Sequence, residues 1–101
     1  MSSVTFAEFQ AADRRLAILR ALESAAAYTV NALLLGRFLE AVGHAVSADR
    51  LAQDLAWLAE QGLLQLADAQ GLKVATLTPR GADVATGRAT VPGVQRPAPG
   101  W

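Results

Sequence analysis

The fold of this chain is decided by residues 46–64, which read VSADRLAQDLAWLAEQGLL. The large apolar residues of this stretch recur at the spacing of one helical face: Leu51, Leu55 and Leu58. Ser47 stands where a helix N-cap is expected, and Gly62 is typical of the position just after a helix end. The stretch therefore predicts a helix over residues 48–61, followed at once by a different kind of structure.

Downstream of Gly62 the apolar period changes from 3.6 to 2. Residues 63–67 and 72–77 are two short β-prone runs separated by four polar or small residues, which predicts a hairpin. Thr78 and Pro79 then supply an N-cap and a first-turn proline. A further helix is expected from there to about Thr86 or Arg88.

Upstream, two further helices are expected. Residues 6–23 carry an apolar helical stripe, and Thr5 with Glu8 fits a capping box. Residues 28–30 are either a very short strand or the entry to the next helix, which spans residues 31–42. The apolar stripes of these two helices are Phe9, Ala12, Leu16 and Leu19 in the first and Leu34, Leu35, Phe38, Leu39 and Val42 in the second.

The last eleven residues, VPGVQRPAPGW, contain three prolines and two glycines. This composition predicts an extended, largely unpacked tail over residues 91–101 after a folded domain over residues 1–90. The whole order predicts a mainly helical α+β fold of the winged helix-turn-helix type: a three-helix core, a two-stranded wing, a C-terminal helix and the tail.

The composition excludes several classes of function. The chain has nine basic and nine acidic residues, no cysteine and a single histidine, His44. Thiolate metal sites and cysteine nucleophiles are excluded, and so is any site that needs two imidazoles. The chain contains neither a glycine-rich phosphate loop nor a nucleophile–base pair, so we expect no enzyme, no cofactor and no metal site. The longest uninterrupted apolar run has five residues, Leu55–Ala59, which is far too short for a membrane span.

Three strings carry a resemblance to a known family. DRRLAILRAL (residues 13–22) is similar to the first helix of ArsR-like bacterial regulators, and residues 46–64 and 73–84 resemble their third helix, wing and closing helix. The whole chain resembles small winged-helix proteins of Mu-like phages and prophages, which are described as ArsR-like transcriptional regulators. The most similar stretches are Asp54–Leu63, Val74–Ala85 and Val91–Pro97.

The resemblance implies a DNA-binding regulator of transcription in the cytoplasm of a bacterial host cell. It also implies a homodimer joined through the first and last helices, with double-stranded DNA as the partner. In this fold the third helix enters the major groove. The candidate DNA contacts are therefore Ser47, Arg50 and Gln53 on that helix and Lys73 on the wing. Against this stands the charge of residues 48–61, in which three acids, Asp49, Asp54 and Glu60, oppose Arg50 alone.

The alternative is a winged-helix protein-interaction module without DNA binding, which would serve phage development, packaging or the binding of a host protein. Its candidate protein contacts are Trp57 and Trp101. Trp57 has a second interpretation, in which it closes the core beneath the wing. The two functions predict different places for the arginines at positions 14, 15, 37 and 80. DNA binding predicts that they converge around Arg50, Gln53 and Lys73, whereas protein binding predicts that they scatter and that the third helix stays acidic.

Overall fold

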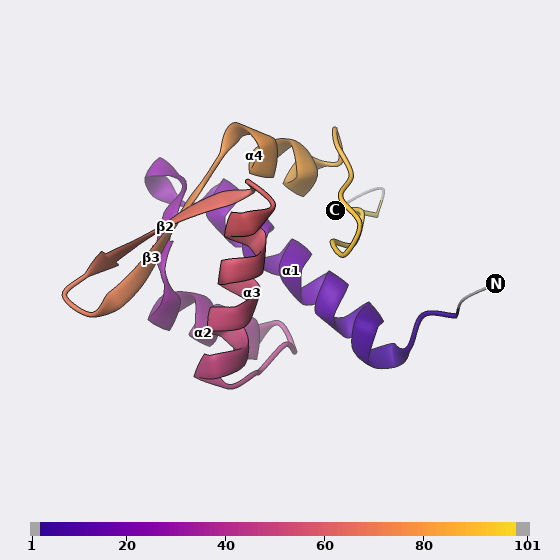
Figure 1. Cartoon of the computed structure of the whole chain (residues 1–101), viewed down its shortest axis with the longest axis horizontal. Coiled ribbons are helices and arrows are strands. Elements are labelled where there is room, and N and C mark those ends of the chain that lie inside the picture. The colour runs from indigo at the N-terminus through magenta and orange to yellow at the C-terminus, as the bar shows by residue number, and fades with distance from the viewer. Residues whose placement is uncertain (1–2, 99–101) are drawn as a thin grey trace.

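The computed structural model describes residues 3–98 and has the predicted order of elements (Figure 1). The elements are α1 (Phe6–Ser24), the 3-10 turn η1 (Ala26–Tyr28), β1 (Thr29–Asn31), α2 (Ala32–Ala41), α3 (Ala48–Glu60), β2 (Leu64–Ala69), β3 (Leu72–Leu77) and α4 (Pro79–Thr86). The chain therefore has the mainly helical winged helix-turn-helix fold that the sequence predicts.

Each long helix begins at a residue whose side chain caps it. The side-chain oxygens of Thr5, Asn31, Ser47 and Thr78 each accept a hydrogen bond from the backbone N–H three residues further on. These bonds satisfy donors that a helix start leaves without an intrahelical partner. The three caps predicted from the sequence, Thr5, Ser47 and Thr78, are confirmed.

The wing belongs to a three-stranded antiparallel sheet with the order β1-β3-β2. The stretch that was ambiguous in the sequence forms the edge strand β1, and the hydroxyls of Thr29 and Thr76 lie 3.0 Å apart across the ladder. The hairpin turn contains two residues, Gln70 and Gly71, where we expected a loop of four. Both have positive φ, as a tight hairpin turn of this hand requires, so β2 continues to Ala69.

The core lies where the helices meet one face of the sheet, and leucine supplies most of it. The α2 side chains that enter it are Leu35 and Leu39, whereas Leu34, Phe38 and Val42 are exposed. Phe9 of α1 is also exposed, since the first turns of α1 extend beyond the elements that cover the rest of that helix (Figure 1). The predicted apolar stripes were therefore too wide.

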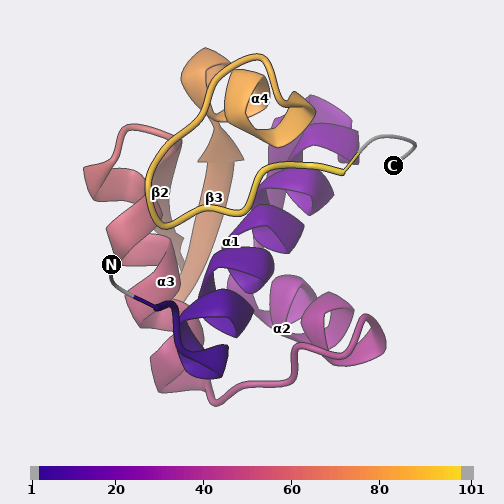
Figure 2. The ribbon, with the colours of Figure 1, turned by 90° about the vertical axis from the view of Figure 1, so that its right-hand side faces the viewer.

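The segment that follows α4 runs first towards α3 and then turns back across α1 (Figure 2). Val91 is buried and Val94 packs against the core. The backbone N–H of Gln95 donates to the carbonyl of Ala12 over 3.1 Å. The prediction of an unpacked tail is therefore wrong for residues 91–98, because two valines three positions apart give this proline-rich segment an apolar side.

Candidate nucleic-acid interface

The helix α3 exposes one ridge on the side opposite its buried leucines. The ridge consists of four exposed residues: Asp49, Gln53, Ala56 and Glu60. Arg50 is also exposed and lies at the flank of the ridge. At the start of the helix the Oγ atom of Ser47 accepts the N–H of Arg50 over 3.1 Å, which leaves the hydroxyl hydrogen of Ser47 available to donate.

Asp54 is not part of this exposed surface. Its side chain is 2% exposed and points into the molecule, towards α1. The Nε atom of Arg14 donates to one carboxylate oxygen over 2.5 Å, and Nη2 lies 3.3 Å from the other. The Nε atom of Arg15 lies 3.5 Å from the same carboxylate. The carboxylate is therefore neutralised by two guanidinium groups inside the protein.

This burial changes the electrostatics of the candidate DNA-binding helix. The sequence gives this helix three acids against the one cation Arg50. Of the three acids, only Asp49 and Glu60 lie on the exposed ridge. The net charge of the exposed side chains of α3 is thus −1 and not −2. The sequence pattern contained one signal of this, since Asp54 lies between Leu51 and Leu58 on the apolar side of the helix.

The wing contributes Lys73, as expected. Its Nζ lies 3.1 Å from a carboxylate oxygen of Asp68, and both side chains are more than half exposed. Exposed pairs of this kind contribute little free energy, so Lys73 can exchange this partner for another anion. Lys73 also lines a groove of about 530 Å³ between α2, α3 and the wing, together with Ser47 and Arg37.

The four predicted DNA contacts form two groups. Ser47 and Lys73 lie in the groove beside the wing, which Ala48 and Ala52 of α3 also line. Arg50 and Gln53 do not line it. Because successive residues of a helix are 100° apart, Arg50 is on the opposite flank of the ridge, next to Trp57. A ligand that contacts all four residues must therefore lie across the ridge of α3.

The arginines do not gather on one surface, and the exposed side chains of α3 keep a net negative charge; this is the arrangement that the protein-interaction function predicts. Arg14 and Arg15 are held by Asp54, and Arg80 donates to the carbonyl of Gln61 at the C-terminal end of α3. Arg37, the fourth of the arginines whose positions distinguish the two functions, lies beside Lys73 in the groove. The cations next to the ridge are accordingly Arg37, Arg50 and Lys73.

Trp57 lies between α1 and the C-terminal segment. The guanidinium of Arg15 stacks over its ring at 4.3 Å from the centroid, and Nη1 of the same arginine donates to the carbonyl of Gly93. A Cβ atom on Gly93 would lie 2.9 Å from the indole, so the backbone there rests on the ring. Trp57 thus covers the core beneath the C-terminal segment and not beneath the wing. Trp101 lies outside the described residues.

His44 is a half-buried residue of the turn between α2 and α3. Its Nε2 lies 2.7 Å from a carboxylate oxygen of Asp13, which connects the turn to α1. Among residues 3–98, no three His, Asp or Glu side chains are placed to hold a metal ion. Over the same residues, no helix is both long and apolar enough to span a membrane.

The sequence has clear relatives. No family model matches it. It is 48% identical to gp26 of Escherichia phage Mu, an uncharacterized protein, over 87 residues that make up 86% of this chain and 90% of gp26. The chain belongs to the gp26 family. A Haemophilus influenzae protein is 38% identical to this gp26-family chain over 78 residues, which are 76% of each protein.

Solved structures agree with the fold of this gp26-family chain. RosR of H. salinarum superposes with a TM-score of 0.62 at 24% identity, over 71% of this chain and 64% of RosR. The structure of the hsRosR-S4 complex gives the same TM-score at 25% identity, over 78% of this chain and 70% of that one. The chain thus spans about two thirds of RosR, and the likeness confirms the winged-helix fold.

Proposed function

We propose that this gp26-family protein binds double-stranded DNA as a regulator, with α3 in the major groove. The observation that carries the proposal is the burial of Asp54 against Arg14, because it leaves Arg50 and Gln53 exposed without that carboxylate beside them. A winged helix presents its third helix to the groove in this way. The likeness to RosR supports the proposal at the level of the fold.

The exposed side chains of α3 and of the groove beside the wing are of types that bind DNA. Arginine pairs with guanine and glutamine with adenine in the major groove, which are the roles we assign to Arg50 and Gln53. The hydroxyl of Ser47 donates to a phosphate while its oxygen keeps the helix cap. Lys73 and Arg37, in the groove beside the wing, contact the backbone of the same duplex.

The finer form of the proposal is a phage regulator of transcription that acts as a homodimer. The relative in phage Mu supports a phage origin. The resemblance to ArsR-like regulators concerns the scaffold, since this chain has no cysteine with which to sense a metal. Two copies would place two α3 helices over half-sites about one helical turn apart.

A titration with duplex DNA at low salt tests the function. Arg37 and Lys73, the two cations assigned to the DNA backbone, predict a weak salt dependence, with a slope of about −2 in the plot of log affinity against log salt. Lys73→Ala should weaken binding and reduce the magnitude of that slope by about one, whereas Arg50→Ala should weaken binding and relax the preference for guanine. Arg88→Ala, at an exposed position after α4, is the control and should change nothing. An absence of binding at low ionic strength would refute the proposal.

The second candidate is a protein-interaction module for phage development, packaging or a host protein. Two observations favour it. The arginines at positions 14, 15 and 80 lie away from the ridge of α3, as this function predicts. The groove beside the wing is also apolar, and Leu33, which is 56% exposed, lines it together with Leu72 and Ala52. Leu33→Asp decides between the two functions, since it would abolish docking of an apolar partner. For DNA binding it would add one acid beside the phosphates and weaken binding only moderately.

A further inference from the structure

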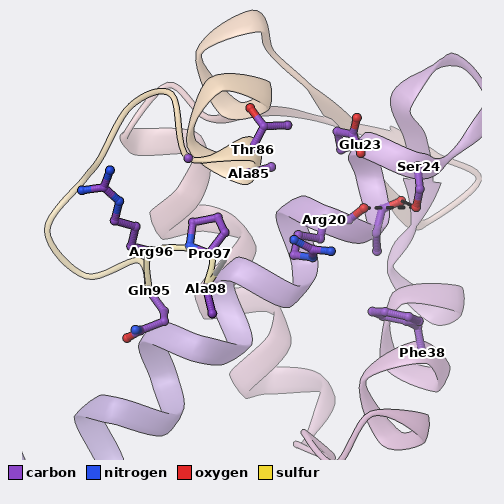
Figure 3. A pocket seen from close by; sticks show the side chains of 12 residues that line it. Arg20, Glu23, Ser24, Phe38, Ala85, Thr86, Gln95, Arg96, Pro97 and Ala98 are labelled. Carbon is purple, nitrogen blue, oxygen red and sulfur yellow. Dashed lines mark hydrogen bonds between the residues drawn. The ribbon is translucent and has the colours of Figure 1, made fainter. Parts of the chain in front are cut away.

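A groove of about 1110 Å³ opens at the C-terminal end of α1 (Figure 3). Its walls come from four parts of the fold: the last turns of α1, helix α2, the end of α4 and residues 95–98 of the C-terminal segment. Among the described residues that line it, none belongs to the candidate DNA interface or to the groove beside the wing. We call this second concave surface the Arg20 groove, after the arginine near its middle.

The Arg20 groove combines a guanidinium with apolar walls. Phe38 of α2 and Pro97 of the C-terminal segment stand on opposite sides of Arg20 (Figure 3). Ala21 and Ala85 add further apolar surface. Rings pack well against flat apolar side chains, and a guanidinium holds a carboxylate by two parallel hydrogen bonds. The groove therefore suits a molecule with a flat apolar body and one anionic end.

The charged side chains of the groove favour an anion over a cation. Two arginines, Arg20 and Arg96, line it against one acid, Glu23, so the described lining has a net charge of +1. The side chain of Arg96 extends away from Arg20 (Figure 3), which leaves one guanidinium near the middle. One guanidinium matches a single carboxylate better than a phosphate that carries several charges.

Arg20 is able to bind such a ligand although it already has a contact within its own chain. A guanidinium has five N–H donors in a planar fork, and a carboxylate engages two of them. The volume of the groove lies just above the range of about 300–1,000 Å³ that is usual for sites of small molecules.

We propose that the Arg20 groove binds a small aromatic carboxylate. The carboxylate lies on the guanidinium of Arg20, and the ring lies between Phe38 and Pro97. The site itself does not depend on DNA binding, whereas an effect of the ligand on DNA affinity would rest on the function proposed above.

The C-terminal segment connects the Arg20 groove to α3. Residues 95–98 form one wall of the groove, and two residues earlier the carbonyl of Gly93 accepts a hydrogen bond from Nη1 of Arg15. The same guanidinium stacks on the ring of Trp57, a residue of α3. A ligand that contacts Pro97 requires the segment to be packed on α1, so its binding stabilises that packing. The ligand should therefore hold the segment against Trp57.

Two probes of the same shape test the chemistry of the site: cinnamate, which carries a carboxylate, and cinnamyl alcohol, which does not. Amide chemical shifts of the full chain are recorded as each probe is added. Cinnamate should bind with a dissociation constant of about 1 mM or below and shift the amides of Phe38, Thr86 and Gln95. The alcohol should bind about tenfold more weakly. Equal affinities, shifts confined to other residues or an absence of binding would overturn the inference.

Three variants locate the site. Arg20→Gln should weaken cinnamate binding by about tenfold and leave the alcohol unaffected, because only the carboxylate contacts the guanidinium. Phe38→Ala should weaken both probes. Phe6→Ala removes a phenylalanine that is 74% exposed at the other end of α1, and as the matched control it should change neither affinity. Circular dichroism checks the fold of each variant, and Arg20→Lys, which keeps the charge without the planar fork, replaces a glutamine variant that does not fold. Cinnamate affinity that is unchanged by the substitution at Arg20 would overturn the inference.

Amide exchange tests the connection to α3. Cinnamate at about ten times its dissociation constant should slow exchange at Val94 and Gln95 by up to about tenfold. Trp57 does not line the groove, but Trp57→Ala should weaken cinnamate binding because it loosens the segment, whereas Trp57→Phe should not. Unchanged exchange at both amides together with unchanged affinity in Trp57→Ala would refute the connection.

Two other occupants of the Arg20 groove give distinct results. If a second copy of the chain covered it, the apparent affinity for cinnamate would fall as the protein concentration rises. If the residues after Ala98 filled it, only a chain that ends at Ala98 would bind the probe. Either result would overturn the inference. All these measurements are made without DNA, so a negative DNA titration would refute the proposed function and leave the ligand site standing.

Discussion

The carboxylate of Asp54 on α3 and the guanidinium of Arg14 on α1 form a buried ion pair at 2.5 Å, 40 residues apart in the chain. The pair connects the candidate recognition helix α3 to α1, the first helix of the fold. It also removes one negative charge from the surface that the duplex would meet. The same contact thus affects stability and the electrostatics of the candidate interface.

Removal of the Asp54 carboxylate should be strongly destabilising. Asp54→Ala leaves Arg14 buried without its partner, which costs about 3–5 kcal/mol of unfolding free energy. Asp49→Ala, on the exposed ridge of the same helix, should change it by less than about 0.5 kcal/mol. Urea denaturation measures both. A double variant, Arg14→Met with Asp54→Leu, should recover much of the loss.

The two glycines inside helices should respond with opposite signs to alanine. Gly81 of α4 packs against the backbone of Leu63, whose carbonyl oxygen a Cβ at residue 81 would overlap. Gly36 of α2 has only the side chain of Leu51 nearby, at 3.7 Å. Gly36→Ala should therefore stabilise by up to about 1 kcal/mol, whereas Gly81→Ala should destabilise by about 2 kcal/mol or more. Thermal unfolding measures both variants. Melting temperatures that shift in the same direction for Gly36→Ala and Gly81→Ala would contradict this packing.

Trp57→Ala should release the C-terminal segment. The indole supports Gly93 and Arg15, and without it the bond from Gln95 to Ala12 loses its neighbouring contacts. Amide exchange at Val94 and Gln95 should then accelerate by at least about tenfold, while exchange in α3 stays slow. Trp57→Phe keeps an aromatic surface and is the control. Equal exchange in the two variants would show that the valines and the backbone hydrogen bonds hold the segment without the indole.

Neutralising the exposed acids of α3 should strengthen DNA binding. Asp49→Asn with Glu60→Gln removes two charges that would face the phosphates of a bound duplex, so affinity at low salt should rise by about threefold to thirtyfold. Asp83→Asn, on α4, serves as the control and should have no effect. Fluorescence anisotropy with a labelled duplex measures the change. Unchanged affinity would place the ridge of α3 outside the interface.

Much of the fold follows from local patterns. The leucines of residues 48–61, the caps at Thr5, Ser47 and Thr78, and the change of period after Gly62 each depend on neighbours in the sequence. The wing was also predictable, except for its turn. Gln70 has a positive φ there, which is uncommon for glutamine and could not be predicted from the residue type. The apolar stripe predicted for residues 31–42 was too wide, because periodicity gives the direction of a side chain but not what covers it.

The candidate site was less predictable. Its residue types are evident from the sequence, and Arg50 and Gln53 are exposed as expected. The side on which Lys73 lies relative to Arg50 depends on how the wing folds over α2 and α3. The position of Arg37 beside Lys73 depends on the same packing.

The sequence by itself determined the order of helices and strands, because caps, turns and apolar periods act over three or four residues. The tertiary structure alone decided the charge of the candidate interface, because Asp54 is neutralised by two arginines that lie about 40 residues away. It also decided that residues 91–98 pack on Trp57 and that Phe6 and Phe9 stay uncovered. These features depend on which surfaces meet in space. A local pattern gives the side of a helix on which a residue such as Asp54 lies, but not the groups that it meets there.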